Sequence, residues 1–219
     1  MRVAIVDYGS GNICSAEKAF EKAGQEYEIA VDVVVTSDAD QVVGADRVVL
    51  PGVGAFADCR DGLNAIDGMV EALREVALQK ARPFLGICVG MQLLAERGLE
   101  HGTHDGLGWI GGEVRPIEPG DARMKVPHMG WNALQQVRSS SVFEGIPNGS
   151  YFYFVHSYYC VPEQDDVVTA MVDYGEMITA VVERGNVVAT QFHPEKSGAH
   201  GLRFYRNFLN NASDGSAHT

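Results

Sequence analysis

The chain has 219 residues, 46% of them hydrophobic, which is enough for one domain to bury a sizeable core. Seventeen Lys and Arg against 29 Asp and Glu give a formal net charge of −12, which argues against nucleic acid or an anionic membrane surface as a partner. The start does not resemble a signal peptide, no stretch approaches the roughly 18 apolar residues of a membrane span, and the four cysteines are scattered. We therefore expect a cytoplasmic protein with free thiols.

The first part of the chain alternates short apolar strands with helices. We predict strands at residues 3–6, 29–35, 48–50 and 84–87, and helices at about residues 12–23 and 59–78. Apolar strands that are separated by helices are typical of a mostly parallel central sheet with helices on both faces.

The pattern becomes β-rich from Trp109 onward. We predict strands at residues 113–117, 131–137, 151–155, 167–172, 178–183 and 187–191, a hairpin turn at 183–186 and a final helix at 200–209. No linker divides the chain. The sequence thus predicts one α/β domain over residues 1–210 with a β-rich C-terminal half, followed by a disordered tail over residues 211–219.

Cys88 is the most informative single residue, because it lies where a strand is predicted to become a helix. Gly86 and Gly90 flank it, which gives the thiol counterpart of the nucleophile elbow of hydrolases. Apolar residues over 91–95 predict that the helix starts directly after the cysteine, where its free N–H groups would favour the thiolate. The alternative is a small buried cysteine that only packs between two glycines.

A thiolate needs a base, and His193 is the best candidate. It follows the last apolar strand, so it should lie at the same sheet edge as Cys88. Pro194 favours an extended backbone at His193, in which Glu195 points to the same side and can orient the imidazole. The sequence thus predicts a Cys-His-Glu triad. The alternative is an ordinary turn that carries a partly exposed histidine.

No cofactor or metal is predicted. His101 and His104 lie in a glycine-rich loop without a third ligand nearby, so we interpret them as loop residues. The glycine-rich stretch over residues 9–12 lacks both the dinucleotide fingerprint and the Walker pattern.

Six segments carry a family resemblance. Residues 86–92 and 192–195 resemble the class I, triad-type glutamine amidotransferases. Residues 7–12, 50–56, 127–132 and 153–159 narrow this resemblance to the glutaminase subunits of imidazole glycerol phosphate synthases, which serve histidine biosynthesis. The similarity runs from about residue 1 to residue 209, in the expected order.

The resemblance implies the following chemistry and roles. Cys88 attacks the amide carbon of L-glutamine, and His193, oriented by Glu195, transfers the protons that release ammonia and then glutamate. The family's oxyanion donors correspond to the main-chain N–H groups of Val53 and Val89. Its substrate contacts correspond to Gly54, Gln92, Ser157 and Tyr158. Without the family, Gln92 could be an exposed helix residue, residues 51–54 a simple turn and Tyr158 a core aromatic.

The resemblance also implies a protein partner, a (β/α)8-barrel cyclase subunit that consumes the ammonia within a heterodimer. The family's interface positions correspond to Asn12, Trp131, Tyr153 and Lys196. Taken alone, the two aromatic residues would fit a core and the lysine a solvated surface.

A second hypothesis concerns regulation. Gly52 allows the peptide that joins it to Val53 to rotate, so the Val53 N–H could point away from the site at rest and into it on activation.

Three rival functions remain open from the sequence. They are a triad glutaminase that serves pyridoxal phosphate synthesis, a cysteine peptidase or thiol-dependent stress protein, and a binding module with a decayed site.

Overall fold

The computed structural model describes residues 1–121 and 123–210, so the tail expected over residues 211–219 lies outside the described residues. A nine-stranded sheet forms the centre of the molecule, in the order β2-β1-β3-β4-β13-β12-β11-β8-β9. Its parallel part consists of β2 (Asp32–Thr36), β1 (Arg2–Val6), β3 (Arg47–Gly52), β4 (Phe84–Cys88) and β13 (Val187–Thr190). Its antiparallel part adds β12 (Met177–Arg184), β11 (Val168–Asp173), β8 (His128–Gln136) and β9 (Tyr151–His156).

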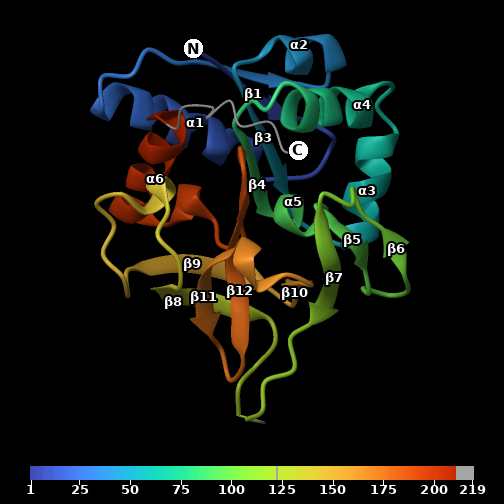
Figure 1. The fold of residues 1–219 in the computed structure, drawn as a ribbon, viewed down its shortest axis with the longest axis vertical. Coiled ribbons are helices and arrows are strands. Elements are labelled where there is room, and N and C mark those ends of the chain that lie inside the picture. Colours follow the sequence, from blue (N-terminus) through green and yellow to red (C-terminus); the bar gives the residue numbers. More distant parts are fainter. Residues whose placement is uncertain (122, 211–219) are drawn as a thin grey trace.

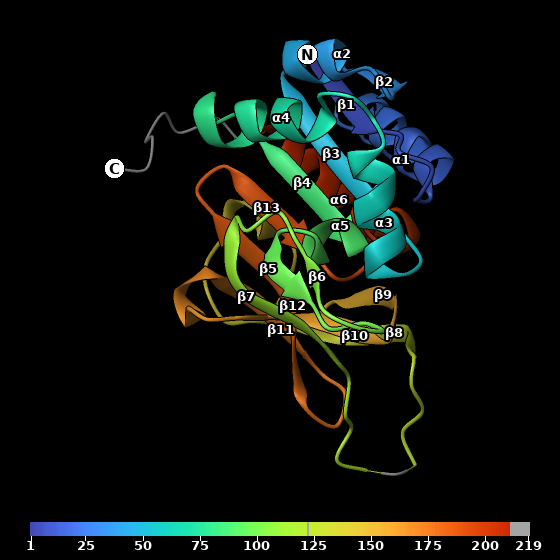
Figure 2. The ribbon, with the colours of Figure 1, turned by 90° about the vertical axis from the view of Figure 1, so that its right-hand side faces the viewer.

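Helices cover both faces of the parallel part, as the sequence predicted (Figures 1 and 2). The helices α1 (Ile13–Glu26) and α6 (Gly198–Asn210) pack against each other on one face. The other face carries α2 (Ala39–Gly44), α3 (Phe56–Asn64) and α4 (Met69–Arg74). Their apolar sides bury β1, β3 and β4 almost completely, which makes this layer the core.

A smaller four-stranded sheet lies beside the central one, and most of it was not predicted. Its order is β10-β7-β5-β6, with β10 (Tyr158–Pro162), β7 (Ile110–Pro116), β5 (Ala95–Gly98) and β6 (His104–Asp105). The expected strand over residues 113–117 is part of β7. The chain passes from β9 to β10 through Ser157, so β10 joins the two sheets.

The helix expected over residues 91–95 is wrong in length. The helix α5 (Val89–Gln92) has a single turn, and the chain then continues into β5 at Ala95. The carbonyls of Leu93 and Leu94 accept hydrogen bonds from the loop at 107–110, which replace the bonds of a longer helix. The dipole of this one-turn helix at Cys88 is therefore weaker than that of the longer helix that we expected.

The helix expected over residues 59–78 is also divided. Gly68 adopts φ 70°, a left-handed conformation that interrupts a right-handed helix, so α3 and α4 are separate. A π-helical turn (Glu75–Gln79) continues from α4. Within the described residues, no helix combines the length and apolar character needed to cross a bilayer, and all four cysteines are free.

Candidate active site

Cys88 lies at the end of β4, in a sharp turn that requires glycines two positions before and two positions after it. The residue has φ 56° and ψ −111°, a strained backbone for a side chain other than glycine. A Cβ on Gly90 would lie 1.9 Å from the Leu50 carbonyl oxygen, and one on Gly86 would lie 2.8 Å from the Gly90 carbonyl oxygen. The two glycines therefore allow the close approach of β3, β4 and α5 that aims the thiol outward from the sheet.

His193 and Glu195 follow β13, which pairs with β4 in parallel, so the two strands end side by side. The His193 Nδ1 atom lies 2.8 Å from Glu195 Oε1, and both side chains are only 2% exposed. Tyr205, on α6, donates from its hydroxyl to the other carboxylate oxygen at 3.4 Å. The carboxylate is thus fixed from a second side and holds the imidazole in one orientation.

The remaining nitrogen of His193, Nε2, is a buried polar atom without a hydrogen-bond partner in the described residues. A buried polar atom without a hydrogen-bond partner destabilises the fold, so its presence here is explained if it exchanges a proton with a reacting group. Burial lowers the pKa of His193, but the Cys88 sulfur and the Glu195 carboxylate outweigh burial and raise this pKa to about 9. At neutral pH both ring nitrogens of His193 therefore carry a proton, and the ring can donate one of them beside the thiol.

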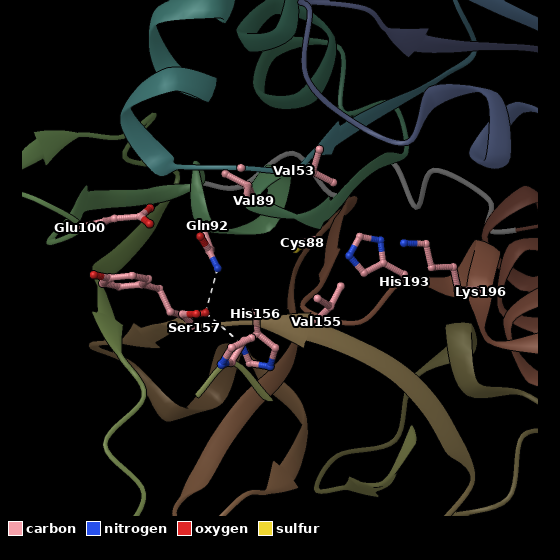
Figure 3. A pocket seen from close by; sticks show the side chains of 13 residues that line it. Val53, Cys88, Val89, Gln92, Glu100, Val155, His156, Ser157, His193 and Lys196 are labelled. Atoms are coloured by element: carbon pink, nitrogen blue, oxygen red, sulfur yellow. Dashed lines mark hydrogen bonds between the residues drawn. The ribbon is translucent and has the colours of Figure 1, made fainter. Parts of the chain in front are cut away.

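A cavity of about 300 Å³ opens beside the sulfur and brings most of the predicted residues together (Figure 3). Its walls contain Val53, Gly54, Cys88, Val89, Gln92, Ser157, Tyr158, His193 and Lys196, all of which the sequence singled out. A cavity of this size fits an amino acid. Segments that lie more than 100 residues apart in the sequence therefore converge on one pocket.

Gln92 is buried and has a fixed orientation, contrary to the alternative of an exposed helix residue. Its Nε2 group donates to the Tyr158 carbonyl at 2.9 Å and to Gln191 Oε1 at 3.1 Å. Gln191 in turn places its own Nε2 3.6 Å from the Cys88 sulfur. Sequence reasoning missed Gln191, although it stands two residues before His193 in an extended segment, where both side chains should face the same side.

Val53 is held by a side chain that the sequence did not single out. Its N–H donates to Ser10 Oγ at 3.2 Å, and the Ser10 hydroxyl donates to the Val53 carbonyl. Cys59 Sγ lies 3.1 Å from the same hydroxyl oxygen. The Val53 N–H is therefore occupied outside the cavity, which matches the resting state of the two-state hypothesis.

Glu100 is a further cavity residue that sequence reasoning missed. Its Oε2 atom accepts from the Phe56 N–H at 2.7 Å at the start of α3, which fixes a carboxylate at the cavity wall. It follows Cys88 by twelve residues in a loop, and no local pattern marks it.

The four predicted interface residues do not form one cluster. Trp131 and Tyr153 are cross-strand neighbours on β8 and β9 with ring centroids 6.1 Å apart, and Lys196 Nζ lies 5.6 Å from the centre of the Tyr153 ring. Asn12 instead borders a narrow cleft behind His193. The Tyr153 carbonyl accepts from the His193 N–H at 2.9 Å, which ties β9 to the residue after β13.

The described residues contain no group of three or more His, Cys, Asp or Glu side chains that could hold a metal ion. The chemistry that this arrangement supports is nucleophilic attack by a thiolate with proton transfer by an oriented imidazole.

Comparisons with known proteins agree with this geometry. The family model for glutamine amidotransferase class-I matches residues 4–212. The chain is 60% identical over 210 residues to the imidazole glycerol phosphate synthase subunit HisH of Rhodospirillum rubrum, a match that covers 95% of this chain and 98% of that protein. It is 57% identical over 212 residues to the subunit of the same name from Brucella melitensis, again with 95% and 98% covered. A crystal structure of a glutamine amidotransferase, 19% identical, matches the fold with a TM-score of 0.67 over 94% of this chain and 96% of the other.

Proposed function

The chain belongs to the class-I glutamine amidotransferases, among the HisH subunits of imidazole glycerol phosphate synthase, and we propose that it releases ammonia from L-glutamine through a thioester on Cys88. The observation that carries this proposal is the position of the Cys88 thiol and the unpartnered Nε2 atom of His193 in one cavity.

The reaction has two halves. The Cys88 thiolate attacks the amide carbon of glutamine, a C–S bond forms, and the carbonyl electrons move to oxygen. His193 then gives its proton to the leaving nitrogen, the C–N bond breaks, and ammonia departs. In the second half, the neutral His193 takes a proton from water, the resulting hydroxide attacks the thioester carbon, and the C–S bond breaks. The product leaves and ionises to glutamate, and the Cys88 thiolate and the protonated imidazole are regenerated.

The oxyanion that forms in both halves requires hydrogen-bond donors. Val89 follows the nucleophile and supplies one main-chain N–H. We assign the second to Val53, whose N–H must turn away from Ser10 before it can reach the oxyanion. One such donor is worth about 2.7–4 kcal/mol of barrier, so this rotation switches the activity.

The glutamine substrate occupies the cavity with its α-groups away from the sulfur. The Glu100 carboxylate offers an acceptor for the α-ammonium group, and the main chain at Gly54, Ser157 and Tyr158 lines the remainder. The Nε2 group of Gln92 donates both of its hydrogens to protein acceptors, the Tyr158 carbonyl and Gln191 Oε1. The Gln92 side chain therefore presents its oxygen to the substrate.

The partner is a (β/α)8-barrel cyclase subunit that forms a heterodimer with this chain. The outer face of β8 and β9 exposes Met129 by 62%, Trp131 by 55% and Tyr151 by 57%, an unusual concentration of apolar surface. Val155 pairs with Met129 on this face and also lines the cavity, so the face continues to the place where ammonia forms. The partner subunit then consumes the ammonia at its own site to form imidazole glycerol phosphate, in a cytoplasm that keeps Cys88 reduced.

The test is an ammonia-release assay on the purified chain, alone and with the cyclase subunit and its ligand. We expect ligand-stimulated release of ammonia and glutamate, which Cys88→Ala abolishes. Stimulation by a pyridoxal phosphate synthase subunit, peptide cleavage, or inertness under every condition would instead support one of the three rival functions.

A further inference from the structure

A series of hydrogen bonds leads from β8 to the cavity, and its first member is Asn132. The Asn132 Oδ1 atom accepts from the Ala133 N–H at 2.8 Å, which fixes the orientation of the amide. The Nδ2 group therefore faces the other way, where it donates to the Asp173 carbonyl at 2.9 Å and approaches His128 Nε2 at 3.3 Å. The amide thus presents a donor to the histidine.

His128 and His156 continue the series. They are directly opposite each other on β8 and β9, and both are buried. His128 Nδ1 lies 3.0 Å from His156 Nε2, and His156 Nδ1 lies 2.9 Å from the Tyr158 carbonyl oxygen. The His128 ring is stacked between Phe154 and Tyr174, with centroid distances of 4.7 Å and 4.0 Å.

Only one arrangement of protons satisfies every bond of this series with neutral rings. A carbonyl oxygen can only accept, so His156 carries its hydrogen on Nδ1 and accepts at Nε2. His128 must then donate from Nδ1 and accept at Nε2, which is where the Asn132 donor lies. Burial lowers the pKa of His128 to about 4 and that of His156 to about 3, so both rings are neutral at physiological pH.

This series of hydrogen bonds ends at the Tyr158 carbonyl oxygen, which also contacts Gln92 in the cavity wall. The Tyr158 carbonyl accepts from His156 Nδ1 and from Gln92 Nε2, which occupies both of its lone pairs. The second hydrogen of Gln92 Nε2 goes to Gln191, whose own amide reaches the Cys88 sulfur. The position of the Tyr158 carbonyl therefore decides which atom Gln92 turns toward the cavity.

We propose that His128 is a positioning residue for the glutamine site: it holds His156 in the Nδ1–H form, which fixes the Tyr158 carbonyl and makes Gln92 present its oxygen to the substrate. His128 does not touch the substrate and takes no part in the bond changes. This role rests on the proposed glutaminase activity, and it concerns the binding of glutamine and not the chemical step.

Two substitutions of His128 separate this role from simple packing. His128→Phe keeps a ring between Phe154 and Tyr174 but removes the donor to His156. His128→Asn loses the ring but retains a donor at the δ position. A packing role makes the Phe variant the milder one, whereas a hydrogen-bonding role makes the Asn variant the milder one.

The readout is steady-state ammonia release by the complex with the cyclase subunit and its ligand, with glutamine as the varied substrate. We expect His128→Phe to raise KM for glutamine about five- to tenfold, with kcat within about twofold, because one positioning hydrogen bond is lost. We expect His128→Asn to keep KM within about twofold of the wild type, even where its urea midpoint is the lower of the two. The opposite order of KM values, or no change in either variant, would overturn the proposal.

A second measurement needs neither partner nor substrate. Imidazole ¹⁵N NMR of the wild-type chain should show His156 protonated at Nδ1 and not at Nε2, and in His128→Phe the His156 Nε2 resonance should move toward that of a nitrogen that accepts no hydrogen bond. An Nε2–H form in the wild type would refute the positioning role. A wild-type complex that releases no ammonia would contradict the proposed function, whereas an active complex with equal KM values in both variants would contradict the positioning role alone.

Discussion

The main chain of Val53 is bound by the side chain of Ser10, although 43 positions separate the two residues. The hydroxyl of Ser10 accepts from the Val53 N–H and donates to the Val53 carbonyl, and Cys59 supports the hydroxyl from the side. The oxyanion donor that we propose is not available for catalysis while it is held in this way. We therefore expect low glutaminase activity in the free chain.

Removing this contact should release the Val53 amide. We expect Ser10→Ala to raise glutaminase turnover of the chain without its partner by about fivefold, because one hydrogen bond contributes about 1 kcal/mol. The measurement is ammonia release without the cyclase subunit, and Ser139→Ala, at an exposed loop position, serves as the control. Unchanged turnover in Ser10→Ala would show that the hydroxyl does not restrain the amide. Replacing Gly52 is a poor test, because a Cβ there would lie 2.7 Å from the Tyr8 hydroxyl and 2.8 Å from the Gly90 nitrogen.

The Glu195 carboxylate should set the alkaline limit of activity. Since the pKa of His193 is raised to about 9, we expect kcat/KM of the wild type to fall as the pH rises through about 9. In Glu195→Gln the limit should move to lower pH and activity should drop about 100-fold or more, because the imidazole loses its anionic partner. The pH profile of kcat/KM measures both effects, with Glu144→Gln as the control for a distant carboxylate.

The same proton is linked to stability. A folded-state pKa above the ordinary value of about 6.5 stabilises the fold fully below that pH, and this contribution is lost as the pH rises through the folded-state value. The free energy of unfolding of the wild type should therefore fall between these two pKa values. Equal pH slopes for wild type and Glu195→Gln in urea denaturation would contradict the proposed ion pairing.

Gly90, two positions after the nucleophile, should be needed for a stable fold. In Gly90→Ala the new Cβ would lie 1.9 Å from the Leu50 carbonyl oxygen, which is backbone and cannot move aside. We expect the free energy of unfolding in urea to drop by about 3 kcal/mol or more. Gly44→Ala is the matched control, because nothing lies within 4 Å of its Cβ, and a stability near that of wild type is expected there. Similar losses in both variants would contradict the steric explanation.

The carboxylate of Glu100 should contribute to substrate affinity. Glu100→Gln keeps an acceptor for the Phe56 N–H but removes the charge that we assign to the α-ammonium group of glutamine. We expect KM for glutamine to rise about tenfold, which corresponds to about 1.4 kcal/mol, while kcat changes little. An unchanged KM would mean that Glu100 only caps α3.

Trp131 should be an anchor of the partner interface. Its side chain is 55% exposed on β8, and large exposed aromatic residues are typical binding hot spots. We expect Trp131→Ala to raise the dissociation constant for the cyclase subunit about 30-fold, which corresponds to a loss of about 2 kcal/mol of binding free energy. Leu78→Ala, at another exposed apolar residue in a different layer of the fold, should leave the affinity unchanged. Isothermal titration calorimetry compares the two variants, and an equal affinity would exclude Trp131 from the interface.

The sequence predicted those features that depend on local spacing. Glycines two positions before and after Cys88 indicated the turn, and His-Pro-Glu indicated the orientation of the imidazole. The division of the helix at Gly68 was missed because a single glycine inside an apolar pattern is compatible with either outcome. The strand β10 was missed because residues 151–162 form a nearly continuous apolar and aromatic run without a turn signal.

The contacts that sequence reasoning could not reach join distant segments. Ser10 meets Val53 through two hydrogen bonds, whereas Asn132 meets Asp173 and Glu100 meets Phe56 through one each. No periodicity or local motif encodes such pairs, since each depends on how the two sheets and α3 are packed. These contacts orient the groups that the local motifs had indicated.

The hydrogen bond from the His193 N–H to the Tyr153 carbonyl connects β9 to the catalytic residues. This strand, at the edge of the central sheet, belongs to the proposed partner face and also accepts a hydrogen bond from the main chain of His193. A displacement of β9 upon assembly would act on the main chain of His193 through this hydrogen bond. We therefore expect binding of a partner at this face to affect the orientation of His193.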